Sequence, residues 1–516
     1  MSRTKYFAQN VKWKFIFVVA SAMMNMLNRY IFMHWMGAEY LGISSLFSSV
    51  LGVLSFADLG LAGAFSFCFY RAIAHQDKEH CSVLITSLER LLNSIAVGIF
   101  AVGLALVPIL PLIITGNDAV DSFHLRLYYV LFLLDMVNGY LFMARTCYVT
   151  AHQNEYLTMP ITTGFSMGKV LAGIVCIILT RNYTLYLCMS ILIGFVQRIV
   201  LNHFICRHFP EAKRRVKGKL TAGELSSIRR NVKAAVVNKI AGISVLQTDN
   251  ILMSIGVGIV TTGFVSNYVS IKTLVMSVIS NIENSLMPSM GNVIATESKE
   301  RQLEIFHQYI SLNTFLISES FILLTVLSTP FIQLLFGEQA VVSFDVVAMM
   351  NLSILFMYST YALNILPSAT GRYDVGLSMV WVEGISNLIF SIIAMRWLGL
   401  LGVYVGTVLG ELIVYIWKPF IVMNKLYGKR PTTYFKITTK GIASALIIGF
   451  ILTATEKRFW PSDYTWISFL LLACYSAVVG VSLYGALHCK DKVFVGWVKT
   501  SITMGKKWIM EKRGII

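Results

Sequence analysis

Hydrophobic runs recur along this chain from Phe15 to Ala486, and short polar stretches separate them. The runs are long enough to cross a hydrocarbon layer of roughly 30 Å as α-helices, and they do not alternate with period two as lipid-facing strands would. The pattern predicts an all-α integral membrane protein. The expected transmembrane helices, about fourteen in number, lie at residues 12–34, 41–65, 86–113, 124–149, 157–179, 183–205, 232–256, 262–287, 307–335, 342–366, 374–397, 402–424, 438–455 and 464–487.

Composition agrees with a membrane location. Of the 516 residues 56% are hydrophobic and 13% are charged, and the mean hydropathy is +0.68. These values lie outside the range of soluble globular proteins. The basic opening sequence MSRTKYFAQNVKWK precedes a full-length hydrophobic run that has no small-residue cleavage site. We therefore expect an uncleaved first helix instead of a signal peptide.

The distribution of Lys and Arg predicts the orientation, because cytoplasmic loops collect these residues. With the N-terminus inside, the inner segments hold most of the basic residues, including the cluster at 213–233 and the tail at 490–513. The outer loops hold little beyond Arg181, Arg396, Lys457 and Arg458. Both termini are thus predicted to be cytoplasmic. Anionic lipid heads account for the net charge of +17, so no nucleic-acid partner is expected.

Motifs of soluble catalysis are missing from the sequence. The eight cysteines show no paired spacing, so they predict neither a metal site nor a disulfide framework. There is no glycine-rich phosphate loop, no H-E-x-x-H motif and no outer loop large enough to house an active site. We expect a protein that is not an enzyme and that needs neither a cofactor nor a metal.

The chain contains an internal repeat. A shift of 221 positions aligns Ala20 with Ala241, Gly37 with Gly258, Gly42 with Gly263, Ser45 with Ser266, Lys78-Glu79 with Lys299-Glu300 and Gly116 with Gly337; a shift of 218 aligns Ala151 with Ala369. Six spans separate equivalent points, so the repeats are predicted to be parallel and related by an axis along the membrane normal. Two such lobes can rock about a central site, which is the geometry of alternating access. The alternative is a duplication that serves assembly only.

The repeat predicts the domain organisation. An N-lobe of six spans covers residues 1–206, and a basic cytoplasmic linker covers 207–231. A C-lobe of six spans covers 232–425. Two further helices lie within 436–487, and a basic tail covers 488–516.

Ionisable residues occur inside several predicted spans. A charge at mid-membrane costs about 2.5 to 3.5 kcal/mol, so these residues must face one another or a hydrated cavity. Polar residues at helical spacing on the first hairpin of each repeat predict a cavity lining. Its candidates are Asn28, Arg29, Asp58, Lys239, Asp249 and Asn250. The alternative is interhelical hydrogen bonding without solvent.

Other residues inside the spans favour a structural role. Glu89, Arg90, Lys169 and Lys418 lie near span ends, where we expect them to snorkel or to pair between helices. Small residues recur every four positions at Gly164, Gly168 and Ala172, and again at Gly402, Gly406 and Gly410. These two ladders predict seams of close helix packing.

Three segments carry a family resemblance. The runs EYLGISSLFSSVLGVLSFADLGLAGAFSFCFYRAIAHQDKE from Glu39, QTDNILMSIGVGIVTTGFVSNYVSI from Gln247 and LGLLGVYVGTVLGELI from Leu398 resemble bacterial polysaccharide flippases of the Wzx type. The resemblance extends over nearly the whole chain. Those flippases belong to the multidrug/oligosaccharidyl-lipid/polysaccharide exporter superfamily, which also holds MATE drug exporters and the lipid II flippase. The resemblance implies two six-helix lobes around a central cavity.

The resemblance implies a cargo and a location. The cargo is an undecaprenyl-pyrophosphate-linked oligosaccharide, moved from the cytoplasmic to the outer leaflet of the bacterial cytoplasmic membrane for capsule, O-antigen or exopolysaccharide assembly. Expected partners are this lipid-linked oligosaccharide, membrane lipids, and the polysaccharide polymerase with its chain-length machinery. A diphosphate needs cationic neutralisation away from water. The buried cations that could supply it are Arg29, Arg145, Arg198, Lys239 and Lys272.

The energy source stays open at this point. Since no nucleotide-binding motif is present, a secondary or facilitated mechanism is expected, in which Asp58, Asp249, Glu319 or Glu383 binds a proton or Na⁺. The main alternative function is an ion-coupled multidrug antiporter of the MATE kind. A membrane glycosyltransferase or polymerase and a scaffold for a polysaccharide machine are further alternatives.

Overall fold

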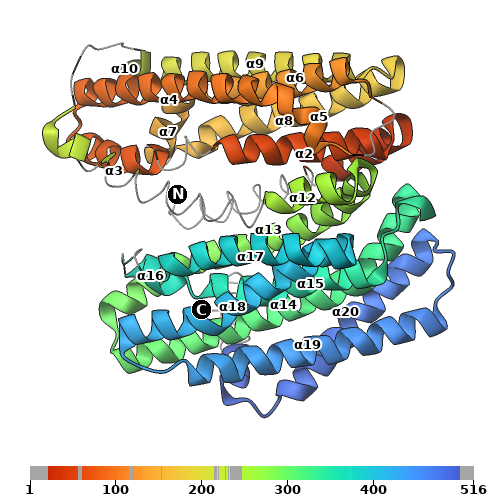
Figure 1. Cartoon of the computed structure of the whole chain (residues 1–516). Helices are drawn as coiled ribbons and strands as arrows, with labels where there is room; N and C mark the ends of the chain where they lie inside the picture. Colours follow the sequence, from red (N-terminus) through yellow and green to blue (C-terminus); the bar gives the residue numbers. More distant parts are fainter. Residues whose placement is uncertain are drawn as a thin grey trace, which may run out of the picture. The chain divides into compact units, whose positions relative to one another are not determined.

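The computed structural model describes residues 21–499, apart from 22, 56–60, 116–119, 153, 214–217, 219, 227, 230, 231, 233–246, 371, 373 and 374. Across these residues the regular structure is entirely helical, which confirms the predicted all-α membrane fold (Figure 1). Nine of the described helices are long and apolar enough to span a membrane, and a bent pair of helices makes a tenth candidate span. Asp58 and Lys239 lie outside the described residues.

The chain divides into two compact units, residues 1–263 and 264–516. Unit 1 contains α2 (Ala38–Leu54), α3 (Leu61–Ala74), α4 (Lys78–Leu106), the 3₁₀ turn η2 (Val107–Ile109), α5 (Leu110–Ile113), α6 (Ser122–Asn138), α7 (Met143–Ala151), α8 (Glu155–Thr180), α9 (Tyr183–His208), α10 (Pro210–Lys213) and α12 (Thr248–Gly256). Helix α13 (Ile259–Thr296) begins in unit 1 and continues into unit 2. The lobe boundaries at residues 206 and 232 stay a prediction.

Unit 2 contains the remaining helices, which are on average longer. They are α14 (Lys299–Phe336), the 3₁₀ turn η3 (Glu338–Ala340), α15 (Phe344–Ala362), α16 (Ile365–Ala369), α17 (Leu377–Leu398), α18 (Leu400–Tyr427), α19 (Thr432–Phe459) and α20 (Trp466–His488). Polar residues cap several of these helices: Ser298 accepts from the backbone N–H of Arg301, and Thr465 forms a capping box with Ser468.

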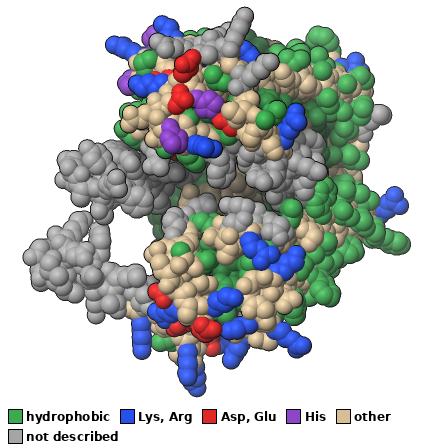
Figure 2. All heavy atoms as spheres, turned by 90° about the vertical axis from the view of Figure 1, so that its left-hand side faces the viewer, with side chains coloured by type: hydrophobic (Ala, Val, Ile, Leu, Met, Phe, Trp, Pro, Cys, Tyr) green, Lys and Arg blue, Asp and Glu red, His purple; other side chains and the backbone are tan. Residues whose placement is uncertain are grey.

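Hydrophobic side chains cover the flanks of the long helices. Leu192, Phe450 and Ile467 are all highly exposed, as expected for helices that face lipid tails. Figure 2 shows Lys, Arg, Asp, Glu and His side chains on the face of each unit that it views, with hydrophobic side chains along the flank. This separation is what a bilayer requires of a multi-pass protein.

The backbone repeats at positions that the 221-residue shift aligns. Gly37 has a φ of 93° directly before α2, and Gly258 has a φ of 118° directly before α13. Side chains rarely adopt this region, so glycine allows the same sharp helix entry in both halves. Each half also contains a helix followed by a short helix, α6 with α7 and α15 with α16, and then a pair of long neighbouring helices.

The span predicted at residues 124–149 is broken. Helix α6 ends at Asn138, α7 begins at Met143, and the two axes differ by 41°. Phe142 carries the break with a φ of 59°, which is unusual for a residue other than glycine. The prediction of one continuous helix was wrong here, because the hydropathy of a sequence does not reveal a break that tertiary contacts hold.

One of the two predicted small-residue seams is confirmed. A Cβ atom on Gly406 would lie 2.2 Å from the backbone nitrogen of Ser391, and one on Gly402 would lie 2.2 Å from the carbonyl oxygen of Ala394, so α18 packs directly on α17. Among the described residues, no atom lies within 4 Å of a Cβ added to Gly164 or Gly168. The packing role predicted for those two glycines on α8 is therefore wrong within the described structure.

Candidate functional site

Unit 1 contains a network of charged side chains between its helices. Lys169 on α8 places Nζ 3.0 Å from Oδ2 of Asp135 on α6. Arg145 on α7 is buried, lies 3.8 Å from Glu89 on α4, and donates to Asn202 on α9. Each of these charges thus has a partner of opposite sign on a neighbouring helix, which lowers the free energy of holding it in the membrane.

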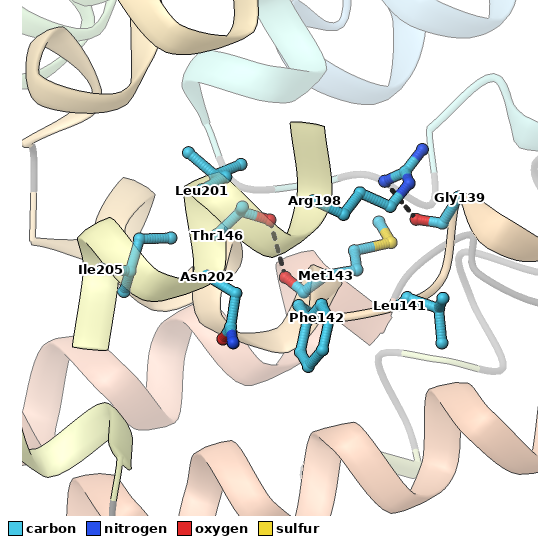
Figure 3. A pocket seen from close by; sticks show the side chains of 9 residues that line it. All are labelled: Gly139, Leu141, Phe142, Met143, Thr146, Arg198, Leu201, Asn202 and Ile205. Atoms are coloured by element: carbon cyan, nitrogen blue, oxygen red, sulfur yellow. Dashed lines mark hydrogen bonds between the residues drawn. The ribbon is translucent and has the colours of Figure 1, made fainter. Parts of the chain in front are cut away.

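Arg198 on α9 holds the broken span. Its Nη1 donates to the carbonyl oxygen of Gly139 at 2.9 Å, just past the end of α6 (Figure 3). The last carbonyl groups of a helix lack intrahelical donors, so a guanidinium satisfies one of them. A small cavity of about 50 Å³ lies beside this contact and is lined by Gly139, Leu141, Phe142, Met143, Thr146, Arg198, Leu201, Asn202 and Ile205.

Unit 2 contains a second buried cluster, on helices α13, α17 and α18. Glu383, Glu411 and Lys418 are all buried, and their charges interact with one another. Lys272 interacts with Glu411 and donates to the carbonyl oxygen of Met350 at 3.2 Å. Two carboxyl and two amino side chains, an equal number of acidic and basic groups, thus interact in one place. Such a cluster can take up or release a single cation with a small change in local charge.

Lys272 is anchored further by Ser353. Its Nζ atom donates to Ser353 Oγ at 3.0 Å. Lys418 places Nζ 6.0 Å from the ring centroid of Tyr361, within the range of a cation–π contact. The lysines therefore extend from α13 and α18 toward α15, and the cluster connects four helices.

Glu319 on α14 stands apart from that cluster. Its side chain is 8% exposed, and neither carboxylate oxygen has a hydrogen-bond partner within the described residues. The carboxyl group lies close to Gly480 on α20, where an added Cβ atom would meet it. A buried carboxyl group without a partner is uncommon and points to a function.

Two polar residues predicted to line a cavity lie on α12 and pack within unit 1. Asn250 Nδ2 donates to Ser49 Oγ on α2 at 2.9 Å. This contact is the direct interhelical hydrogen bond that the sequence left open as the alternative. Asp249 precedes it on α12. Asn28 and Arg29 lie on the helical segment 23–36, where both are partly buried.

The sequence predicted pairing between helices but not the partners. Lys418 was expected to snorkel or to pair between helices; only 4% of it is exposed and it faces Glu383 on α17, which confirms the pairing alternative. Lys169 and Glu89, for which the same was expected, pair with Asp135 and Arg145. One signal was available: Glu411 and Lys418 are seven positions apart on one helix, which places opposite charges on the same face.

The predicted cytoplasmic linker is docked on unit 1. Tyr148 donates to Glu211 Oε1 at 2.8 Å, and the carbonyl oxygen of Glu211 accepts from Ser82 at 2.8 Å. His80 Nε2 lies 2.6 Å from Glu224 Oε1. Burial raises the pKa of the Glu224 carboxyl, but hydrogen bonds from His80 and Thr221 outweigh it and hold the pKa below its usual value.

Metal ligands do not gather in the described part of the chain. No group of three or more His, Cys, Asp or Glu side chains there is arranged to hold a metal ion. The chemistry available in these clusters is therefore charge pairing, hydrogen bonding and proton exchange.

Comparison with solved structures identifies the fold. The chain is similar to the lipid II flippase MurJ in an inward closed conformation, with a TM-score of 0.66, 14% identity, and coverage of 92% of this chain and 98% of that chain. It is also similar to an inward-facing MATE family multidrug transporter of the MOP superfamily (TM-score 0.61, 14% identity, 83% and 96% coverage). The Vibrio cholerae MATE transporter VcmN in its bent form gives a TM-score of 0.51 at 15% identity, with 84% and 96% coverage.

Sequence comparisons add no family. No protein-family model matches the chain, and no curated protein sequence matches it. The structural matches define the class of fold: a multi-pass membrane protein with the architecture of MOP-superfamily transporters. At 14% identity they define the fold and not the substrate.

Proposed function

We propose that this protein flips an undecaprenyl-pyrophosphate-linked oligosaccharide across the bacterial cytoplasmic membrane by alternating access, as a flippase of the Wzx type. The supporting observation is the fraction of this chain that the match to the lipid II flippase covers. That match leaves 8% of the 516 residues uncovered, which is about 41 residues. Helices α19 and α20 run from Thr432 to His488, and this segment is longer than the uncovered part. Part of this C-terminal pair must therefore belong to the shared fold.

The MATE match does not require the C-terminal pair. It leaves 17% of the chain uncovered, about 88 residues, which is enough to omit both helices. A transporter of a lipid-linked cargo has a use for two additional helices, since the polyprenyl tail must stay in an apolar environment while the head group crosses. We assign α19 and α20 to contact with that tail.

Three of the predicted cations contact protein groups in the described structure. Arg145 and Arg198 contact protein groups inside unit 1, and Lys272 donates to Met350 and Ser353. These residues organise the helices around the cargo. Arg29 and Lys239, on the first span of each repeat, are the residues that we propose bind the diphosphate. Their guanidinium and ammonium groups match the charge of that ligand.

The energy source is proposed to be a cation gradient. Glu383 is the strongest candidate among the predicted coupling residues, because it lies with Glu411 and Lys418 in a balanced cluster. Neutralising one carboxylate by a proton or Na⁺ changes the attraction between α17 and α18. The polymerase and chain-length proteins remain proposed partners.

A multidrug antiporter is the second candidate function. The match to MATE transporters, at a TM-score of 0.61 over 96% of one such chain, favours it. An antiporter of organic cations would change the sensitivity of cells to such compounds. A flippase would not.

The distinguishing experiment measures which leaflet holds the lipid-linked oligosaccharide in cells that lack the gene and any redundant flippase. Restoration with the wild type should return the oligosaccharide to the outer leaflet. Arg29→Ala should fail to do so, while Arg396→Ala, which removes an exposed cation at the end of α17, should succeed. Normal outward display without the gene would refute the flippase and favour the antiporter.

A further inference from the structure

Helices α14, α19 and α20 pack together (Figure 1). Buried polar groups lie in a line along the seam between them. On α20 the buried positions include Ser476, Gly480, Tyr484 and His488, which recur every four residues. This spacing places them on one face of the helix. The face meets α14 near Glu319.

Glu319 lies at the inner end of this line. A Cβ atom on Gly480 would be 2.8 Å from Glu319 Oε2, so the glycine leaves room for the carboxyl group. Neither oxygen has a hydrogen-bond partner, and no Lys, Arg or His lies within 4.0 Å of them in the described structure. An ionised carboxylate there would be buried and unpaired, which is far more costly than the neutral acid.

Two hydroxyl groups lie next along the seam. Tyr484 is 2% exposed, and its hydroxyl would be 3.0 Å from a Cβ on Gly441 of α19. The carbonyl oxygen of Gly441 accepts from Ser318 Oγ at 3.4 Å, and Ser318 is the neighbour of Glu319 on α14. The tyrosine and serine hydroxyls interact with each other. Tyr484 also interacts electrostatically with Glu319, which places its hydroxyl near the carboxyl group.

His488 continues the line by one helical turn. Its ring stacks on the ring of Tyr484 with centroids 4.1 Å apart, and its Nδ1–H donates to the Tyr484 carbonyl oxygen at 3.0 Å. In the neutral ring the other nitrogen, Nε2, is then a proton acceptor. Nε2 is buried and has no hydrogen-bond partner within the described residues.

The line ends at the polar end of α20. Lys440 on α19 lies 2.7 Å from Asp491, and both side chains are partly exposed. The charged and titratable groups that face the line are thus Lys440, Asp491, His488 and Tyr484. The basic character of this end of the chain predicts that it is cytoplasmic.

We propose that Glu319 is a proton-binding group that exchanges its proton with the aqueous phase at the C-terminal end of α20, through His488, Tyr484 and Ser318. In one transfer, His488 Nε2 first accepts a proton from water, and the imidazolium then passes it toward Tyr484. Each hydroxyl passes on its own proton as it accepts one, and the Glu319 carboxylate becomes a carboxylic acid, while His488 returns to its neutral Nδ1–H form. One proton moves, and nothing is oxidised or reduced. This inference rests on the proposed function, because proton binding at Glu319 supplies the coupling to an ion gradient that the proposed function uses.

Infrared difference spectroscopy of the full-length protein in lipid vesicles tests the proposal without any cargo. The probe is the carboxylic acid C=O stretching band in neutral buffer. Glu319→Gln should remove one component of this band. Glu304→Gln, which removes an exposed carboxylate from the same helix, should leave the band unchanged. An unaltered band in Glu319→Gln would refute proton binding at this site.

Exchange kinetics test the route. After transfer into D₂O, the Glu319 band should shift at least about tenfold more slowly in Tyr484→Phe and His488→Phe than in the wild type, because both variants keep the ring and remove the proton carrier. Wild-type rates in both variants would overturn the route. Tyr484→Phe and His488→Phe also test proton exchange at Glu319 if the Glu319→Gln variant does not fold.

A transport measurement separates this inference from the proposed function. In vesicles that carry the lipid-linked oligosaccharide, the wild type should respond to an imposed pH gradient and Glu319→Gln should not. If the wild type flips the oligosaccharide and transport by Glu319→Gln still responds to the pH gradient, a coupling role for Glu319 is refuted. A wild type that never flips would refute the proposed function and leave the infrared result standing.

Discussion

Gly42 and Gly263, which the 221-residue repeat aligns, cross each other closely within unit 1. A Cβ atom on Gly42 would lie 2.0 Å from the carbonyl oxygen of Ile259, and one on Gly263 would lie 2.0 Å from the carbonyl oxygen of Ala38. Ala38 and Ile259 are themselves separated by the same 221 positions. The contact between α2 and the start of α13 is therefore reciprocal.

Substitution at this crossing should be strongly destabilising. In Gly42→Ala the new methyl group would meet backbone instead of a mobile side chain, so α2 and α13 must separate. We expect a loss of about 1 to 3 kcal/mol in the free energy of unfolding, seen as a lower thermal unfolding midpoint in detergent.

Gly164→Ala on α8 is the matched control for that substitution. A Cβ there meets nothing within 4 Å among the described residues, so stability should stay unchanged or rise slightly, as alanine favours helix. Equal destabilisation by Gly42→Ala and Gly164→Ala would contradict the close contact between α2 and α13.

The broken span gives a second prediction. Arg198→Ala leaves the Gly139 carbonyl without its donor at the end of α6, and we expect a loss of about 1.5 to 3 kcal/mol, the range for a hydrogen bond to a charged group. Arg207→Ala, at an exposed position on the same helix, should change stability by less than about 0.5 kcal/mol. Thermal unfolding monitored by circular dichroism measures both. If Arg198→Ala unfolds at the wild-type temperature, the guanidinium does not hold the break.

The sequence predicted the helices of this fold better than their contacts. Run length and hydropathy placed α8, α9, α17 and α18 within a few residues of their observed ends, because burial in lipid demands a continuous apolar helix. The break at Phe142 was not predictable, since the side chain that bonds to the backbone beside it, Arg198, is remote in sequence. The charge pairs were missed for a related reason. Hydropathy gives the depth of Lys169 in the membrane but not the rotation of its helix toward Asp135.

The third prediction concerns acid and the docked linker. The pKa of Glu224 lies below its usual value of 4.5 in the folded protein, so its contribution to docking is complete above that value. It is lost as the pH falls through the lower, folded pKa. We expect faster hydrogen exchange of residues 222–226 in acid, after correction for the intrinsic rate.

Glu224→Gln should abolish this acid dependence, because it removes the carboxyl group that titrates. It should also weaken docking of the linker by about 1 kcal/mol at neutral pH. Glu79→Gln, an exposed carboxylate beside His80, should retain it. An acid response that survives in Glu224→Gln would place the responsible group elsewhere.

The last prediction concerns the balanced cluster in unit 2. Lys418→Met leaves Glu383 and Glu411 buried without their nearest cation on α18, and breaking such a pair typically costs about 3 to 5 kcal/mol. Adding Glu411→Gln removes one of the two remaining negative charges and should recover at least about half of that loss. Lys425→Met, an exposed lysine on the same helix, should be neutral. Unfolding free energies of the two single variants, the double variant and the wild type form a thermodynamic cycle that gives the coupling between Lys418 and Glu411. Coupling near zero would mean that the two groups are neutral in the folded protein, and the cluster could then act in transport only by taking up charge during the cycle.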